Sequence, residues 1–328
     1  MTSIELPPRF SDRPFLVSAA RAASVGDARL RGPDLERPSR GVRVPPEASA
    51  HPLPIVNRCQ AYAPLLRPGQ LFSHTTAAML WRVPLPSALK RGYSIVVGAS
   101  PVSGAAPAPL HVTSTTGVRP RRAGIIGHRA EPGPLVVGRF GLPTSSAPDT
   151  WVSLAPLLTL DELIMAADSL VNVPPYVDNK DPRPFTTIAE LRRAVEQSST
   201  RGVRLAELAL REVRVGSESP RETLLRLLLV RAGLPNPSLN VDVTTRDGKR
   251  SLGRGDLVWE NFRTLCEYDG EQHRTDSTQY SRDERRIEDF MHAEWHVVRV
   301  RKSGMVGAGR DDTIERVKKA LRMGGWRG

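Results

Sequence analysis

The chain has 328 residues, of which 47 are Lys or Arg and 35 are Asp or Glu, so its formal net charge is +12. A hydrophobic content of 39% and a charged content of 25% are typical of globular domains, and the 29 prolines and 26 glycines imply long connections. The two cysteines, Cys59 and Cys266, are too few for a disulfide framework. We therefore expect both thiols to be reduced and buried.

The positive charge favours a polyanionic partner, with DNA as the first candidate, because Lys and Arg release counterions when they approach phosphates. A basic surface that only improves solubility is the alternative. No apolar run is long enough to span a membrane. The N-terminal residues also lack the layout of a signal peptide. We expect a cytoplasmic protein that does not bind membranes, and the sequence does not indicate its oligomeric state.

Residues 1–50 show the order of elements that is typical of a winged helix-turn-helix. An Ala-rich run at 19–23 predicts a first helix, residues 26–30 predict a second, and a hairpin is expected around Gly41. An Ala-rich helix followed by a basic loop also occurs in domains that bind no nucleic acid. We predict a winged helix-turn-helix-like domain over 1–50.

Residues 51–200 are predicted to form a mixed α/β scaffold domain. A helix is expected over 73–81, and strands over 93–97 and 110–113. His74, at the start of the first helix, is interpreted as a structural histidine. The basic turn from Arg119 to Arg122 could contact phosphates or could simply be solvated. Two more helices are expected, over 161–168 and 188–197.

The last third of the chain has the clearest pattern. Ser219-Pro220-Arg221-Glu222 predicts a helix start with Ser219 as N-cap, Pro220 at the first position and Glu222 completing a capping box. Strands, helices and turns then predict the order αβββαβα over residues 215–328, with strands at 239–245, 256–259, 264–268 and 296–300 and helices at 279–293 and 311–322. The acidic pair Asp311-Asp312 would favour the dipole of the last helix. The fold class is α/β for this domain and α+β overall.

Two acids lie within apolar strand segments, Asp256 in Gly255-Asp256-Leu257-Val258-Trp259 and Glu267 in Leu265-Cys266-Glu267-Tyr268. A carboxylate rarely lies beside buried residues without a partner. If the two strands form a hairpin, both carboxylates could face one point. Mg²⁺ is usually held by one or two carboxylates, waters and substrate phosphates. The pattern therefore predicts a Mg²⁺ site, with Mn²⁺ as an alternative ion, and phosphodiester cleavage.

With this order of elements, residues 215–323 resemble the PD-(D/E)XK nuclease superfamily, and within it the very-short-patch-repair-like endonuclease domain. The resemblance is carried by Ser219-Pro220-Arg221-Glu222, Gly255-Asp256-Leu257-Val258-Trp259, Glu267-Tyr268-Asp269-Gly270, His273, Asp283, Arg286 and Trp295-His296-Val297-Val298-Arg299-Val300. It implies a restriction-endonuclease-like fold and a metal-dependent DNA endonuclease. It also implies that Asp256 and Glu267 bind the metal and that Glu222 binds it directly or through water. A capping role alone is the alternative for Glu222.

The chain departs from the superfamily two residues after the second acid, where a Lys is usual and Asp269 is found. Asp269 could be a further metal ligand, or it could order the Asp-Gly turn. His273 is then the candidate general base or phosphate contact, since histidine titrates near neutrality; an ordinary loop histidine is the alternative.

Two further features lie on and after the helix that follows. Asp283 and Arg286 lie three apart on one helix face and are expected to pair, although Arg286 could also contact DNA. Glu294 occupies a position where related sequences carry a helix-ending Gly, so we expect a slightly strained turn there.

The N-terminal part resembles the AbiEi-type antitoxin region, through residues 14–46 and the segment Phe72-Ser73-His74-Thr75-Thr76-Ala77-Ala78. This resemblance implies DNA binding by the first domain and does not establish a toxin–antitoxin function. The leading hypothesis is a Mg²⁺-dependent DNA endonuclease that is targeted partly by its N-terminal domain. The alternative is a DNA-binding, antitoxin-like transcriptional regulator whose nuclease-like domain is inactive. A module that binds only proteins is the third hypothesis.

Overall fold

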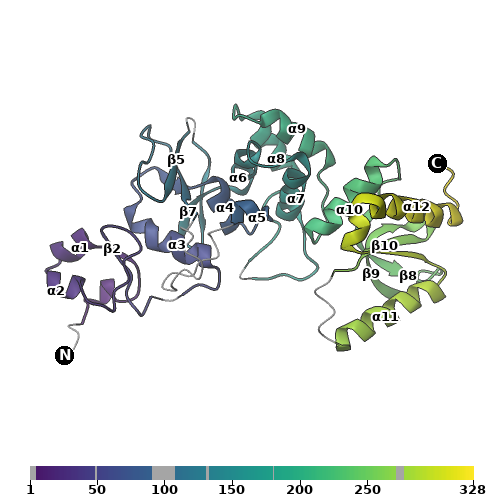
Figure 1. Ribbon diagram of the computed structural model, residues 1–328, viewed down its shortest axis with the longest axis horizontal. Coiled ribbons are helices and arrows are strands. Elements are labelled where there is room, and N and C mark those ends of the chain that lie inside the picture. Colours follow the sequence, from purple (N-terminus) through teal and green to yellow (C-terminus); the bar gives the residue numbers. More distant parts are fainter. Residues whose placement is uncertain (1–4, 49, 91–107, 131–132, 180, 271–276) are drawn as a thin grey trace. The chain divides into compact units, whose positions relative to one another are not determined.

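The computed structural model describes residues 5–48, 50–90, 108–130, 133–179, 181–270 and 277–328 (Figure 1). It is of the mixed α and β class, as predicted. Its contacts divide the chain into two compact units, one made of Met1–Leu157 and Arg193–Val203 and the other of Leu158–Arg192 and Arg204–Gly328. Within the described ranges, no helix combines the length and the apolar character that crossing a membrane requires.

The first unit begins with a small helical region. The two predicted helices are present as α1 (Val17–Ala22) and α2 (Asp27–Leu30), and a short helical turn, Pro8–Phe10, precedes them. Strand β1 (Phe15–Leu16) pairs antiparallel with β2 (Val42–Arg43), and an isolated bridge joins Glu36 to Val44. The segment around Gly41 therefore turns back on itself. A small apolar cluster holds the region together, formed by Phe10, Phe15, Ala20, Leu30 and Leu35.

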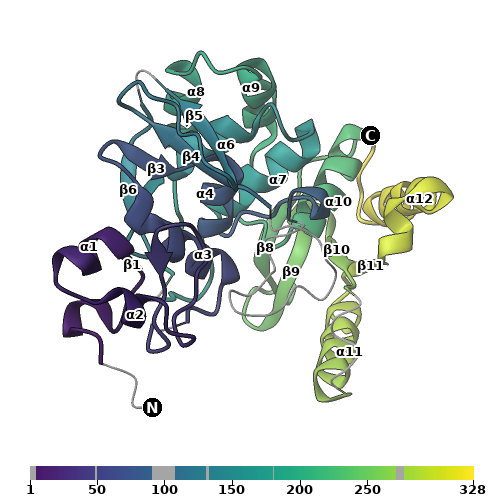
Figure 2. The same ribbon diagram turned by 60° about the vertical axis from the view of Figure 1, so that its left-hand side comes forward.

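The rest of this unit is built on a five-stranded sheet with the order β5-β4-β3-β7-β6 (Figure 2). Its strands are β3 (Gln70–Phe72), β4 (Leu110–Ser114), β5 (Ile125–Arg129), β6 (Val136–Arg139) and β7 (Leu142–Ser145). Its helices are α3 (Pro54–Tyr62), α4 (His74–Leu80), α5 (Ser87–Lys90) and α6 (Ala147–Leu154). The core joins Val56 of α3 and Leu80 of α4 to Phe72 and Val112 of the sheet. The predicted strand at 110–113 is confirmed as β4, whereas the strand predicted at 93–97 lies outside the described residues.

Helix α7 (Leu160–Val171) belongs by its contacts to the second unit. A capping box fixes its start: the Thr159 side chain accepts from Glu162 N, and the Glu162 carboxylate accepts from Thr159 N. Helices α8 (Ile188–Glu196) and α9 (Val203–Glu212) follow. The predicted helices at 161–168 and 188–197 are thus both confirmed.

The remainder of the second unit is a four-stranded sheet between helices. Its elements follow in the order α10 (Pro220–Arg231), β8 (Ser238–Thr244), β9 (Ser251–Trp259), β10 (Thr264–Tyr268), α11 (Ser277–His292), β11 (His296–Val300) and α12 (Gly307–Met323). The strand order is β11-β10-β9-β8, and only β10 and β11 run parallel. Figure 1 shows α10 and α12 on one side of this sheet and α11 on the other.

Alternating side chains of the strands supply a core to each face of this sheet. Leu257, Trp259, Cys266 and Val298 pack with residues of α10 and α12, whereas Val258, Leu265 and Trp295 pack with Phe290 of α11. Cys266 and Cys59 are free and buried, as predicted. Burial raises the pKa of both thiols, so neither is poised to react at neutral pH.

Two local predictions concern the ends of helices, and one of them was wrong. Helix α12 begins at Gly307 rather than 311, so Asp311 and Asp312 lie beyond its first turn and the predicted dipole interaction is wrong. The earlier start depends on Gly309, because a Cβ there would lie 2.2 Å from the Ser303 carbonyl oxygen. Glu294, just after α11, has φ +61°, which agrees with the strain expected of a non-glycine residue at that turn.

Candidate functional site

The β9–β10 hairpin brings Asp256 and Glu267 together. The two strands pair antiparallel with Leu257 opposite Cys266, which confirms the predicted hairpin. The Asp256 N–H donates to Glu267 Oε1 (3.3 Å), and the Tyr268 N–H donates to Asp256 Oδ2 (2.7 Å). Asp256 is half-buried and Glu267 is buried. Both acids therefore belong to one contact network next to the α11 face of the sheet.

Glu222 lies at the start of α10, where the Ser219 side chain caps the helix by accepting from Glu222 N (3.2 Å). The reciprocal half of the predicted capping box is wrong, because the Glu222 carboxylate accepts from Glu218 N (2.8 Å) and not from Ser219 N. The same Oε2 atom also accepts from Asn240 Nδ2 (2.6 Å). Glu222 is therefore held toward strand β8.

Asn240 is a site residue that the sequence analysis missed. It lies in β8 between the pairs Leu239↔Leu257 and Val241↔Gly255, and therefore beside Asp256 in the neighbouring strand. Its φ is +48°, and its Nδ2 also donates to the Gly216 carbonyl (2.9 Å). Asparagine tolerates this left-handed conformation better than most residues. An amide between two apolar residues of a strand was the signal that could have identified it.

The carboxylates repel one another. The pKa of Asp256 is raised well above its usual value, first by burial and then by the negative charges of Glu267 and Glu222. The Tyr268 N–H and the Arg286 guanidinium act in the opposite direction. Excess negative charge on oxygen donors is what a hard divalent cation neutralises, so the residues fit Mg²⁺.

The carboxylate oxygens of Asp256, Glu267 and Glu222 do not form a set of three within 4.8 Å of one another. Among the residues that the structure describes, three ligand atoms of His, Cys, Asp or Glu lie within 4.8 Å of one another at one place. All three belong to histidines of the first unit. A hydrogen bond from the Asp256 N–H joins Asp256 to Glu267, while Glu222 is bound to Asn240 of β8 and acts on Asp256 through its charge.

Arg286 of α11 supplies positive charge to this site. Its Nη2 lies 2.7 Å from Glu267 Oε2, and its Nη1 donates to the Arg254 carbonyl (2.6 Å). Gly253, with φ +114°, permits this crossing, because a Cβ there would lie 3.1 Å from Arg286 Cδ. The expected partner of Arg286 was Asp283, whose side chain lies outside the described residues. The sequence analysis did not predict the contact with Glu267.

Asp269 is bound to two arginines of the region that follows α11. Its Oδ2 accepts from Arg299 Nη2 (3.2 Å) and Arg301 Nε (3.1 Å), and its backbone N–H donates to the Val300 carbonyl (2.8 Å). Of the two roles left open for Asp269, these contacts favour a structural one, namely fixing the ends of β10 and β11. His273, the candidate base, lies outside the described residues.

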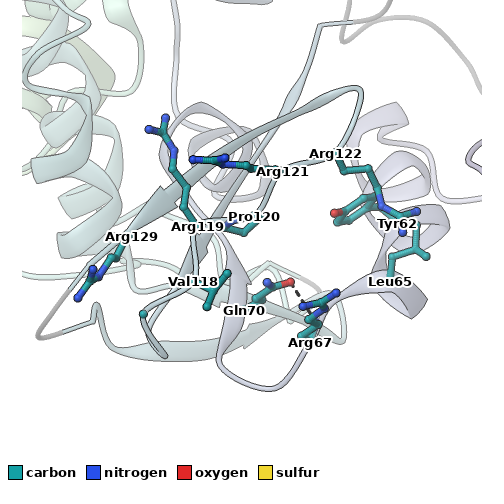
Figure 3. Close-up of a pocket in the computed structure, with 11 residues that line it drawn as sticks. Tyr62, Leu65, Arg67, Gln70, Val118, Arg119, Pro120, Arg121, Arg122 and Arg129 are labelled. Carbon is teal, nitrogen blue, oxygen red and sulfur yellow. Dashed lines mark hydrogen bonds between the residues drawn. The ribbon is translucent and has the colours of Figure 1, made fainter.

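The first unit contains a basic pocket of about 620 Å³ (Figure 3). Arg119, Arg121 and Arg122 reach it from the basic turn noted in the sequence, and Arg67 and Arg129 complete its arginines. None of the 11 residues that line it in the described part of the chain is acidic. We call this site the arginine pocket.

Tyr62 is a buried aromatic residue that lines the arginine pocket. Burial raises the pKa of its hydroxyl, while the charges of Arg122 and Arg67 act to lower it, so both guanidinium groups lie near this hydroxyl. Figure 3 shows Arg122 beside Tyr62 and Arg67 beside Gln70, whose Oε1 accepts from Arg67 N (3.1 Å). The pocket therefore combines several guanidinium groups with an aromatic hydroxyl.

The chain matches no protein-family model, no curated protein and no solved structure. Inference about its function therefore depends on the chemistry of the residues described above.

Proposed function

We propose that the chain is a metal-dependent DNA endonuclease whose active site contains Asp256, Glu267 and Glu222. The observation that supports this most directly is the contact between Asp256 and Glu267 across the β9–β10 hairpin, within a group of carboxylates that repel one another. The element order around them, with helices on both faces of a four-stranded sheet, agrees with a restriction-endonuclease-like domain.

Asp256 and Glu267 would hold Mg²⁺, or Mn²⁺ in its place, and Glu222 would contact the ion directly or through water. When bound, the ion polarises the phosphate and lowers the pKa of a water near it. Asn240 and the Glu218 N–H orient the Glu222 carboxylate, since both donate to its Oε2. The protein thus provides oxygen donors whose directions are set by their own hydrogen bonds.

Arg286 provides the positive charge that the motif lacks at position 269. A guanidinium remains charged at any physiological pH, and it can stabilise the negative charge that develops on a phosphate. Its present partner is Glu267 Oε2, so it already lies beside the second acid. His273 remains the candidate general base from the sequence.

DNA binding is supported by the net charge of +12 and by the arginine pocket. Guanidinium groups bind phosphates through paired hydrogen bonds, and a pocket without acidic lining favours an anionic ligand. The pocket includes Arg119, Arg121 and Arg122 of the basic turn, for which the sequence left phosphate contact and simple solvation open.

The test is cleavage of duplex, mismatched and single-stranded DNA by the purified chain with Mg²⁺ or Mn²⁺. Asp256→Asn and Glu267→Gln should each remove cleavage while the circular dichroism spectrum stays unchanged. Asp269→Asn is the matched control and should retain activity within about tenfold, because it removes an acid that is bound to arginines instead of a metal ligand. Activity that survives in Asp256→Asn would exclude this assignment.

A DNA-binding regulator with an inactive nuclease-like domain is the second candidate. It is favoured by the acid at position 269, where the superfamily usually has Lys, and by the ion pairs of Asp269 with Arg299 and Arg301. This candidate predicts DNA binding that weakens with salt and no cleavage with either ion. The same preparation therefore distinguishes the two functions.

A further inference from the structure

Three histidines from separate elements come together in the first unit. His74 begins α4, His111 lies in β4 and His128 lies in β5. One ring nitrogen of each lies within 4.8 Å of the other two, and all three residues are partly buried. The parallel register sets Thr113 opposite His128 and His111 opposite Ile126, so His111 and His128 are diagonal neighbours on the same face of the sheet.

The contacts within this histidine cluster are specific. His111 Nδ1 lies 3.0 Å from His128 Nε2, which is one hydrogen bond between two imidazoles. The ring of His74 stacks on that of His128, with centroids 3.6 Å apart and planes at 14°. His74 Nδ1 lies 3.0 Å from Ser73 Oγ. His74 was interpreted from the sequence as a structural histidine, and its contacts with His111 and His128 were not predicted.

The protein around the cluster fixes its members. Thr113 Oγ1 donates to Ser73 Oγ (2.7 Å), and the His111 N–H donates to Thr76 Oγ1 (2.8 Å), so α4 is bound to β4 next to the rings. His74 itself has φ +50°, a left-handed conformation that costs a non-glycine residue about 1 kcal/mol or more. Strained residues of this kind persist where the surrounding structure holds them, and they concentrate at functional sites.

Burial favours the neutral form of the three imidazoles. Burial lowers the pKa of His74 to about 3, and lowers that of His111 and that of His128 to about 4, with neighbouring positive charge as a further cause. A neutral imidazole has a free lone pair on one nitrogen, which is the form that binds metals.

We propose that His74, His111 and His128 form a binding site for a transition-metal ion such as Zn²⁺. Three histidine ligands with a fourth position left open are a known arrangement for this ion, whose Zn–N bonds of about 2.0–2.1 Å place two tetrahedral ligands roughly 3.3 Å apart. The His111–His128 separation of 3.0 Å is close to that value. The nitrogen donors also distinguish this site from the carboxylate site, which suits Mg²⁺.

Binding requires two local changes. The ion replaces the hydrogen bond between His111 and His128, and the His74 ring turns off the face of His128, because two stacked rings cannot both direct their lone pairs at one ion. The proposal is independent of the nuclease assignment, since its residues belong to the other unit.

The experiment is a titration of the full chain, freed of metal by a chelator, with Zn²⁺ by calorimetry and with Co²⁺ by visible absorption. We expect one equivalent to bind at the cluster, absorption bands of a Co²⁺ ion with nitrogen ligands, and a higher thermal midpoint with Zn²⁺. His111→Asn and His128→Asn should each weaken binding by at least about 100-fold, since a ligand matters more than its supporting groups.

His292→Asn is the matched control, because His292 is exposed on α11 and lies outside the cluster. The His292→Asn chain should bind Zn²⁺ with the same affinity as the native chain. Asp256→Asn should likewise keep the Zn²⁺ equivalent, which separates this site from the acid site. The far-ultraviolet circular dichroism of each variant reports folding. Absence of binding by the native chain, or one equivalent retained by folded His111→Asn and His128→Asn chains, would overturn the proposal.

Discussion

Asp168 and Arg226 form an ion pair inside the second unit, with Arg226 Nη2 2.8 Å from Asp168 Oδ2. The Asp168 side chain is 2% exposed and the Arg226 side chain 3%. Asp168 also accepts from Thr223 Oγ1 (2.9 Å) and from Arg214 N (2.8 Å). The pair connects α7 to α10, the helix that carries Glu222. Helix α7 is therefore part of the framework that supports the candidate active site.

Replacing Asp168 with Ala should destabilise the second unit by about 3–5 kcal/mol, because it leaves the charge of Arg226 buried without its partner. The free energy of unfolding measured with urea gives this value. The control is Asp161→Ala, which removes the exposed pair with Arg231 and should cost less than about 1 kcal/mol. A loss for Asp168→Ala as small as the control's would contradict the structural role of the pair.

Asp256→Asn should abolish cleavage without destabilising the metal-free chain. Because the folded state raises the pKa of Asp256, it binds a proton more tightly than the unfolded state, and stability falls as pH rises above the usual carboxyl value. The uncharged variant escapes this loss. Its free energy of unfolding should equal the native value near pH 3 and exceed it at pH 7. A variant less stable at pH 7 than the native chain would contradict the repulsion.

Arg286→Met should lower the cleavage rate by about 10²–10³-fold, because it removes the positive charge beside Glu267. Arg286→Lys should lose less, since the charge is kept and only the second hydrogen bond, to the Arg254 carbonyl, is lost. Single-turnover rates at saturating Mg²⁺ measure the effect. Arg285→Met removes the same charge from the exposed neighbouring position and should leave the rate within about twofold.

Glu294→Gly should stabilise the chain by about 1 kcal/mol, because φ is +61° at this position and glycine adopts that conformation without steric cost. The ion pair with Arg246 that the change removes is 70–80% exposed and contributes little. The thermal midpoint provides the measurement. Glu294→Ala removes the same ion pair but keeps a Cβ, so a gain in that variant would exclude backbone strain as the cause.

The Arg121→Ala, Arg122→Ala double variant should bind DNA more weakly, and the slope of log affinity against log salt should fall by about 2. Both residues line the arginine pocket and are exposed. Fluorescence anisotropy at several salt concentrations measures the slope. Arg201→Ala removes an exposed arginine that does not line the pocket and should change the slope much less. An equal change per residue would indicate binding through net charge alone.

The elements that the sequence predicted well are those with local signals. Ser219 and Pro220 mark the start of α10, and the apolar run that follows Asp256 marks the second half of β9, whose first five residues were not predicted. Such signals arise from capping and from runs of apolar residues, which involve neighbours within a few residues. The contact of Asp256 with Glu267 followed from the expected hairpin in the same way.

The rest depends on contacts between distant parts of the chain. Arg286 reaches Glu267 only because α11 packs across the sheet, and Asn240 reaches Glu222 only because β8 lies beside the start of α10. The early start of α12 depends on the fit of Gly309 against Ser303. The histidine cluster joins residues 37 and 17 positions apart, which no local pattern connects.

The ion pair between Arg286 and Glu267 has a thermodynamic consequence. Under the proposed function, a divalent ion on Glu267 would compete with the guanidinium for the same carboxylate, so binding of the ion and the Arg286–Glu267 pair would be linked equilibria. A ligand that pairs with Arg286, such as a phosphate of the substrate backbone, would raise the affinity of Glu267 for the ion. By thermodynamic linkage, the bound ion would raise the affinity of the protein for that ligand by the same factor. Substrate and cofactor would then bind cooperatively, through one arginine that exchanges partners.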